Sequence, residues 1–445
     1  MNNQNQMIDD SLETQIYSLG NATIESPIQR CTGIADPYFV SDQERILVNI
    51  DYKTCQEHSK TNWNPASFEL AGPRSNIFFD PSKVKCAIVT CGGLCPGLND
   101  IIRSIVLELN FAYGVKNIQG IKYGLQGFIP KYQHELIQLS PDRVESIHAL
   151  GGSILGSSRE RQEIRAIVHT LDRLNIGILF MVGGDGTLTA ANQVACEIEK
   201  NNLKISIVGI PKTIDNDIFM ISKSFGFDTA VEHATTAIRS AHAEASGYPN
   251  GIGLLKLMGR YSGFIAATAA LAQQDVNFVL IPEVDFDLHG PKGFLTALKK
   301  RLLERKHAVI VVAEGAGRKF FSNDPDNLKT NDVGLFLKEK ISHFFQQQNT
   351  PINLKYIDPS YIIRSLPANS NDHAFCNFLG RDAVHAGMAG KSRLIIGYWN
   401  DRFVHIPLKL CAGKRKQIQP RSKLWASVLE STGQGELKEL IGDTK

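Results

Sequence analysis

The segment that most constrains how this chain can fold is Gly-Gly-Asp-Gly-Thr at residues 183–187, because of what lies on either side of it. Residues 176–182 before it form an apolar run that predicts a buried strand, and residues 188–200 after it have helical spacing. A strand that leads through glycines into a helix brings bare backbone N–H groups to one point, where the helix dipole favours an anion. The segment therefore predicts a phosphate-binding turn in an α/β fold.

The aspartate in this segment adds a second constraint. A carboxylate that faces phosphate groups repels them unless a divalent cation lies between the two. Asp185 therefore indicates a site for magnesium and a polyphosphate. A tight strand-to-helix turn with a capping aspartate is the alternative that the pentapeptide alone leaves open.

A second segment follows the next predicted strand, at residues 204–210. It reads Pro-Lys-Thr-Ile-Asp-Asn-Asp over residues 211–217, and in an extended stretch Asp215 and Asp217 would share a face. This set suits a sugar phosphate kinase, in which one carboxylate takes the hydroxyl proton, another holds substrate or metal, and a cation stabilises the phosphoryl group. An Asx-rich turn after a strand is the alternative.

Bulk properties exclude some classes of partner. A length of 445 residues predicts two or three domains, and a net charge of +3 without a basic run argues against nucleic acid. We see neither a signal peptide nor an apolar run that could cross a membrane, so we expect a cytoplasmic protein with no membrane partner. Cys91 and Cys95 lack a second pair for zinc, and the eight cysteines are expected to be reduced thiols.

The rest of the chain alternates between strand and helix patterns after a polar N-terminal extension, residues 1–82, which we expect to be partly ordered at best. Further strands are predicted at 84–90, 252–257, 278–281, 307–313 and 393–398, and helices at 100–109, 228–245, 263–273 and 290–306. Asp228 stands where an N-cap would. Such alternation predicts parallel sheets with ligands at the carboxyl ends of the strands.

Several motifs together resemble the phosphofructokinase family and occur in its order: the glycine loop at 91–99, the segments at 183–187 and 213–217, and Met-Gly-Arg at 258–260. The resemblance runs from about residue 85 to about residue 391. Details match the plant and trypanosomatid ATP-dependent branch, namely the segments at 71–74, 209–217, 256–266 and 356–364.

The resemblance implies a fold and a division into domains. It implies an α/β fold of two Rossmann-like parallel-sheet domains, with the active site in the cleft between them, plus the N-terminal extension. Residues 83–227 would bind ATP and Mg2+, residues 228–364 would bind fructose 6-phosphate, and residues 365–445 would return to the body. Family members are homo-oligomers, and a dimer or a tetramer is expected.

The resemblance also implies roles at the phosphoryl donor and at the reacting hydroxyl. Gly93 and Arg159 would lie at the terminal donor phosphates, and Asp185 would bind Mg2+. Asp215 would be the general base on the sugar 1-hydroxyl. The other residues implied for donor binding and catalysis are Lys212, Thr213, Gly184, Gly186, Thr187 and Arg260.

The implied sugar phosphate site is the part that departs from the bacterial pattern. Its residues would be Thr213, Ile214, Asp215, Asp217, Met258, Gly259, Arg260, Glu314, Lys355, Tyr361 and Arg364. Gly251 stands where bacterial members have an arginine that reaches a neighbouring subunit, and Tyr361 stands where they have histidine. Lys355 is the candidate for the missing charge.

Two positions bear on the donor. A carboxylate at Gly186, as in pyrophosphate-dependent members, would oppose the α-phosphate of a nucleotide, so the glycine leaves room for ATP. Lys212 attracts either donor. The resemblance thus implies an ATP-dependent 6-phosphofructokinase of glycolysis, which transfers the γ-phosphoryl to the 1-hydroxyl of D-fructose 6-phosphate and gives fructose 1,6-bisphosphate. The alternatives are the same transfer from pyrophosphate, an NAD or lipid kinase, and a sugar phosphate sensor without activity.

Overall fold

A computed structural model describes residues 12–58, 65–321 and 332–438, and this part of the chain divides into two compact units. Within the described residues, the larger unit comprises 12–58, 65–226 and 364–415, and the smaller comprises 227–321, 332–363 and 416–438. The predicted C-terminal segment, 365–445, is thus shared between the units. No helix in the described ranges is both long and apolar enough to span a membrane.

The larger unit is built around a sheet in the order β3-β4-β17-β16-β10-β9-β6-β7-β8. The strands are β3 (Arg45–Leu47), β4 (Ser67–Leu70), β6 (Cys86–Thr90), β7 (Ile118–Ile121), β8 (Ile137–Gln138), β9 (Ile178–Gly183), β10 (Ser206–Pro211), β16 (Leu394–Trp399) and β17 (Arg402–Pro407). The central strands from β16 to β7 are parallel, and the strands beyond them at both edges are antiparallel. β6, β9 and β10 are buried along their whole length, as parallel strands covered on both faces are.

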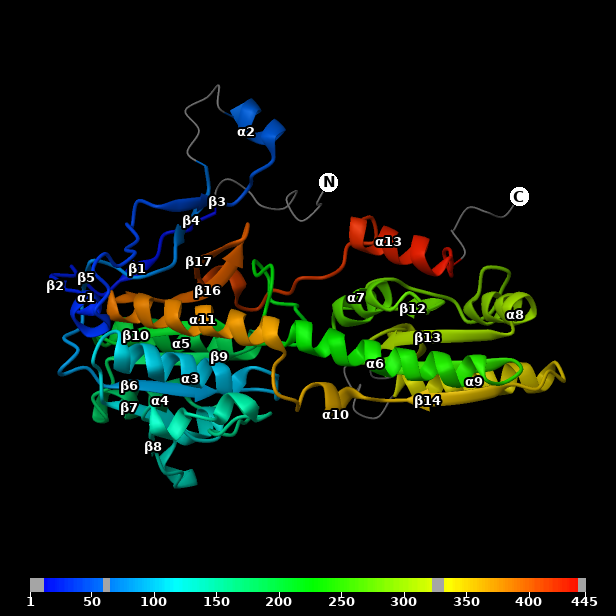
Figure 1. The fold of residues 1–445 in the computed structure, drawn as a ribbon, viewed down its shortest axis with the longest axis horizontal. Coiled ribbons are helices and arrows are strands. Elements are labelled where there is room, and N and C mark those ends of the chain that lie inside the picture. The colour runs from blue at the N-terminus through cyan, green and yellow to red at the C-terminus, as the bar shows by residue number, and fades with distance from the viewer. Residues whose placement is uncertain (1–11, 59–64, 322–331, 439–445) are drawn as a thin grey trace. The chain divides into compact units, whose positions relative to one another are not determined.

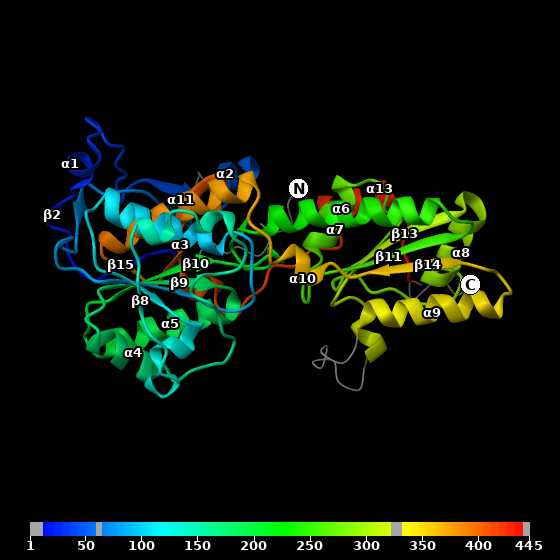
Figure 2. The same ribbon diagram turned by 60° about the horizontal axis from the view of Figure 1, so that its bottom comes forward.

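Helices cover both faces of this sheet. Figure 2 shows α3 (Leu98–Phe111) and α11 (Ser370–Met388) on one face, and α4 (Ile164–Arg173) and α5 (Asp185–Lys200) on the other. The remaining short elements of the unit are β1 (Tyr17–Ser18), β2 (Ile24–Glu25), β5 (Asn76–Ile77), β15 (Lys391–Ser392), α1 (Ile28–Thr32), α2 (Tyr52–His58), α12 (Leu408–Cys411) and the 3-10 turns η2 (Gly124–Phe128), η3 (Pro130–Tyr132), η4 (Asp142–Val144) and η5 (Ile147–Ala149).

The smaller unit has a parallel sheet of its own, in the order β12-β13-β11-β14 (Figure 1). The elements are α6 (Phe227–Ser246), β11 (Gly251–Leu257), α7 (Phe264–Ala272), β12 (Phe278–Leu280), α8 (Phe294–Arg305), β13 (His307–Ala313), η6 (Arg318–Phe321), α9 (Val333–Gln347), β14 (Asn353–Ile357), α10 (Ser360–Ile363) and α13 (Lys423–Thr432). Ile252 and Leu254 on one face of β11 join the apolar core with α8 and α9. Gly253 on the other face admits α6, since a Cβ there would lie 2.9 Å from the carbonyl oxygen of Ala241.

Most predicted elements agree with the structure to within a few residues, and the α/β class with parallel sheets is confirmed. The N-cap assigned to Asp228 is wrong, because α6 begins one residue earlier at Phe227 and Asp228 lies inside the first turn. The negative charge of its carboxylate is still stabilised there by the positive end of the helix dipole. The N-terminal extension is more ordered than expected in its described part, since β3 and β4 extend the main sheet through β17.

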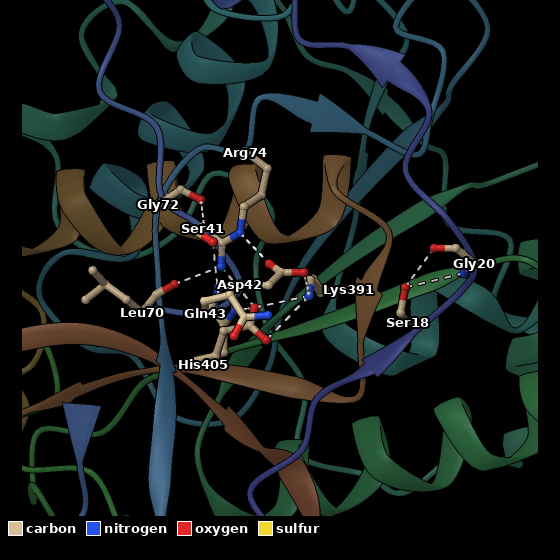
Figure 3. A network of polar contacts seen from close by, with 11 residues as sticks. Ser18, Gly20, Ser41, Asp42, Gln43, Leu70, Gly72, Arg74, Lys391 and His405 are labelled. Carbon is tan, nitrogen blue, oxygen red and sulfur yellow. Dashed lines mark hydrogen bonds and ion pairs between the residues drawn. The ribbon is translucent and has the colours of Figure 1, made fainter. Parts of the chain in front are cut away.

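An ionic cluster that is buried except for Asp42 joins this extension to the sheet (Figure 3). Glu69 on β4 accepts hydrogen bonds from Arg74 at 2.9 Å and from His405 at 3.0 Å. Asp42 binds Arg74 at 2.7 Å and Lys391 at 2.7 Å. Burial works to raise the pKa of Glu69, but the hydrogen bond from His405 and the nearby cations outweigh it and lower the pKa to about 2. Glu69 is therefore the ionised centre of the cluster.

Replacing this carboxylate should destabilise the larger unit. Glu69→Gln would leave Arg74 and Lys391 with Asp42 as their acid, and we expect the free energy of unfolding at pH 7 to fall by about 3–5 kcal/mol. Because the pKa of Glu69 is lowered from 4.5 to about 2 on folding, its contribution is complete above pH 4.5 and is lost as the pH falls towards 2. The difference in the free energy of unfolding between wild type and Glu69→Gln should therefore decrease as the pH falls from 4.5 to 2.

Denaturant unfolding followed by circular dichroism checks this expectation. The matched control is Lys83→Gln, which breaks an exposed ion pair with Asp80 and should leave the free energy of unfolding nearly unchanged. Equal effects of the two substitutions at pH 7 would contradict the role assigned to Glu69.

Candidate active site

The topology of the larger unit fixes where a ligand can bind. From β6 the chain first adds β7 on one side and then β9 on the other, so the strand order reverses between β6 and β9. In open parallel sheets, ligands bind at the carboxyl ends of the strands at such a switch point. The turn after β6 carries the first glycine loop, the turn after β9 carries residues 183–187, and the neighbouring β10 leads into residues 211–217. Three of the predicted motifs therefore lie at one edge of the sheet.

The turn between β9 and α5 is shaped by glycines with different surroundings. Gly183 ends β9, and Gly184 is the extended N-cap of α5. The buried Thr187 donates its backbone N–H to the carbonyl of Gly184 at 2.9 Å. A Cβ at Gly183 would lie 2.2 Å from the Thr187 hydroxyl, whereas a Cβ at Gly186 would meet nothing within 4 Å. The space beside Gly186 is therefore open.

Asp185 begins α5 and is held by the C-terminal part of the larger unit. Its Oδ1 accepts the backbone N–H of Gly413 at 2.8 Å, and its Oδ2 lies 3.7 Å from the Arg415 guanidinium. Among the described residues, no group of three or more His, Cys, Asp or Glu could hold a metal. Magnesium bound with a polyphosphate needs one or two carboxylates, with phosphate oxygens and water as its other ligands. A single carboxylate at a helix start fits that mode.

Lys212 joins two of the turns. Its side chain is buried, and its ammonium donates to the carbonyl of Gly93 at 2.7 Å. Burial lowers the pKa of Lys212. Arg159 and Arg364 also approach this loop, with guanidinium nitrogens 3.1 Å and 3.8 Å from the Cβ position of Gly93. Three cations thus gather around one glycine, which is the charge arrangement that a polyphosphate requires.

The segment after β10 is a turn, so the extended geometry expected for it is wrong. Residues 214–215 form the turn, and Asn216 has a left-handed φ of 52°. The Thr213 hydroxyl organises it, accepting the backbone N–H of Asp215 at 3.1 Å and donating to the carboxylate of Asp217 at 3.1 Å. The backbone follows the Asx-rich alternative, and Ile214 inside it is buried. The Thr213 hydroxyl thus contacts both the backbone of Asp215 and the carboxylate of Asp217.

In the smaller unit, β11 and β13 end side by side and bring Met-Gly-Arg next to Glu314. Glu314 donates its backbone N–H to the carbonyl of Leu257 at 2.9 Å, and Gly315 donates to that of Gly259 at 3.2 Å. Gly259 has a φ of 129°, which a side chain at this position would strain. The guanidinium of Arg260 lies over the Tyr261 ring at 5.4 Å. Met258, Gly259, Arg260 and Glu314 therefore form one cluster at the carboxyl edge.

Lys355 does not join that cluster within its own chain. On β14 it pairs in register with Gly253, five positions before Met258, or about 16 Å along the strand. Its ammonium lies 5.8 Å from the ring of Tyr248, which precedes β11 at the amino edge of the sheet. The position of Lys355 is instead close to Gly251, the place of the missing arginine.

The sequence analysis missed the side chains that position Tyr361. Lys256 at the end of β11 pairs with Asp358 at 2.8 Å and with Asp332, the N-cap of α9. Asp358 in turn accepts the backbone N–H of Ser360 at 3.1 Å, at the start of the short helix that carries the exposed Tyr361. Burial works to lower the pKa of Lys256, but hydrogen bonds to the two carboxylates raise it. In the sequence, Lys256 could have been noticed because it closely precedes the Met-Gly-Arg motif, but its acidic partners Asp332 and Asp358 are distant in sequence.

Comparison with known proteins shows the family of this chain. A model of the family described as Phosphofructokinase matches residues 85–387, and the chain belongs to this family. A relative from Borreliella burgdorferi, named ATP-dependent 6-phosphofructokinase, is 49% identical over 96% of this chain and 97% of its own length. The protein of that name from Trypanosoma brucei brucei is 42% identical over 83% of this chain and 77% of its own length.

A solved structure shows the same fold at lower identity. The pyrophosphate-dependent phosphofructokinase from Marinobacter aquaeolei matches with a TM-score of 0.66, covering 80% of this chain and 93% of that one at 20% identity. The predicted family resemblance and fold are thus confirmed.

The glycines of the β9–α5 turn give a paired prediction. We expect Gly186→Ala to leave the free energy of unfolding unchanged or to raise it by up to about 1 kcal/mol, because its Cβ meets open space in a helical first turn. We expect Gly183→Ala to lower it by about 1–3 kcal/mol, because its Cβ must displace Thr187. Denaturant titration of the two variants measures both, and equal stabilities would contradict the geometry of this turn.

Proposed function

We propose that this chain acts as an ATP-dependent 6-phosphofructokinase, transferring the γ-phosphoryl group of ATP to the 1-hydroxyl of D-fructose 6-phosphate to give fructose 1,6-bisphosphate. Relatives named for this activity align over nearly the whole chain, including one from Amycolatopsis methanolica that is 41% identical over 95% of it. The structural observation that carries the proposal is the set of three turns at the switch point, with cations gathered around Gly93.

The roles proposed for individual residues follow from their contacts. Asp215 would accept the proton of the 1-hydroxyl, held in place by its backbone hydrogen bond to Thr213. Lys212 and Arg159 would bind the donor phosphates beside Gly93, and Gly184, Gly186 and Thr187 would line the donor site. Asp185 would hold Mg2+, which when bound neutralises charge on the phosphates. The remaining residues, proposed for the sugar phosphate, are Asp217, Met258, Gly259, Arg260, Glu314, Tyr361 and Arg364.

Removing the proposed base should stop turnover without unfolding the protein. We expect Asp215→Asn to lower turnover by about 10²–10⁴-fold, because no carboxylate would then accept the hydroxyl proton. ATP affinity, measured by isothermal titration, should stay close to that of wild type. Asp172→Asn, at an exposed position on α4, serves as the control and should leave the rate unchanged. Turnover of Asp215→Asn within tenfold of wild type would refute the assignment.

The donor is tested at Gly186. We expect product formation with ATP and Mg2+ and none with pyrophosphate, and we expect Gly186→Asp to lower kcat/KM for ATP by at least about 100-fold, because the new carboxylate opposes a phosphate. Gly186→Ala adds bulk without charge, so its kcat/KM for ATP should fall much less than that of Gly186→Asp. Wild-type activity with pyrophosphate alone would favour the pyrophosphate-dependent alternative.

Two further aspects are part of the proposal. All eight cysteines, each within the described residues, are free thiols, which supports a reducing compartment such as the cytoplasm. We also propose that the chain works as a homo-oligomer, a dimer or a tetramer. In such an assembly Lys355, which lies away from Met258 in its own chain, would be available to the sugar phosphate of a neighbouring copy.

A further inference from the structure

The segment that follows α12 contacts the donor side of the larger unit. Gly413 donates its backbone N–H to one oxygen of Asp185, and the Arg415 guanidinium lies 3.7 Å from the other. The backbone of Arg415 also forms an antiparallel bridge with Ile218, immediately after the turn that carries Asp215. The segment therefore lies between two of the proposed reacting elements.

These contacts engage the carboxylate that is proposed to hold magnesium. A divalent cation needs the oxygen lone pairs that Gly413 and Arg415 approach, and two cations at one carboxylate repel each other. Binding of Mg2+ must therefore weaken the pair between Asp185 and Arg415. A guanidinium released beside a polyphosphate has a suitable new partner, since its fork of donors matches phosphate oxygens.

We propose that Arg415 is a further residue of the phosphoryl-donor site and that it exchanges partners there: it pairs with Asp185 before the donor binds, and with a phosphate group of a nucleoside triphosphate once Mg2+ occupies Asp185. This inference rests on the proposed function of the donor site. In this proposal the arginine both neutralises Asp185 before the donor binds and binds the donor afterwards.

The surroundings of Arg415 allow such an exchange. Its backbone is fixed by the bridge to Ile218 and by α12, whose Leu408 and Cys411 are fully buried. Its side chain is 34% exposed and that of Asp185 is 26% exposed, so solvent and a ligand can reach the pair. Lys212, in contrast, is buried and bound to the Gly93 carbonyl. Arg415 is thus a more exposed cation than Lys212, and it lies on the Asp185 side of the site.

The exchange predicts opposite shifts in two affinities when the guanidinium is removed. In Arg415→Gln the carboxylate keeps the hydrogen bond from Gly413 but loses its ion pair. Mn2+ alone, followed by electron paramagnetic resonance of the free ion, should therefore bind about twofold to fivefold more tightly. The magnesium complex of ATP, measured by isothermal titration without sugar phosphate, should bind about 10-fold to 100-fold more weakly. Arg415→Lys should retain part of the ATP affinity, because lysine keeps the positive charge but lacks the forked hydrogen-bond donors of a guanidinium.

The matched control is Lys414→Gln, which removes the neighbouring cation, whose ammonium lies 5.5 Å from the Phe219 ring, and should change neither affinity. If Arg415→Gln weakens both ligands, the residue is merely structural. If it strengthens both, the pair is an inhibitory clamp, and if neither affinity changes, Arg415 has no part in the site. Each of these results overturns the inference. Failure of the proposed function would differ, because wild type itself would then not bind ATP.

Discussion

The candidate site depends on one buried ammonium. Lys212 leaves water at the end of β10 and finds its acceptor in the carbonyl of Gly93, a residue of the loop after β6. Burying a charge with a neutral partner is costly, and the lowered pKa of Lys212 expresses that cost. An anion bound at this edge would offset that cost. The arginines at Gly93 and the carboxylate of Asp185 are arranged around that same position.

Both units use one rule of construction. Parallel strands expose their carboxyl ends at a common edge, and each unit places its candidate site residues there. In the larger unit these are the turns after β6, β9 and β10, and in the smaller unit the Met-Gly-Arg segment with Glu314 after β11 and β13. The two units differ in the ion pairs that hold the neighbouring elements in place. The larger unit holds its outer strands by the ionic cluster around Glu69, whereas in the smaller unit Lys256 pairs with two acids to fix the starts of α9 and α10.

Sequence patterns predicted the strands and helices well wherever burial repeats over a short stretch, as in β9, β13 and α6. They predicted the candidate site through motifs that are contiguous in the chain. They failed where geometry depends on distant partners. Gly413 and Asp185 lie 228 positions apart, so no local pattern marks their contact. The turn at Asp215 depends on the Thr213 hydroxyl, which bridges two groups. The strands β3 and β4 have three and four residues, which is too short for a repeating pattern to predict them.

The division of the chain also bears on how it is made. The chain passes from one unit to the other at Gly226, at Ile363 and at Arg415, so each unit is assembled from separate stretches. In the main sheet, β10 has β16 as its neighbour, and β4 reaches the sheet through β17, yet both partners are synthesised after the whole of β11 to β14. Strands near the start of the chain therefore obtain some of their sheet partners only after strands near its end have been synthesised. The larger unit therefore cannot complete its sheet before the strands of the smaller unit have been synthesised.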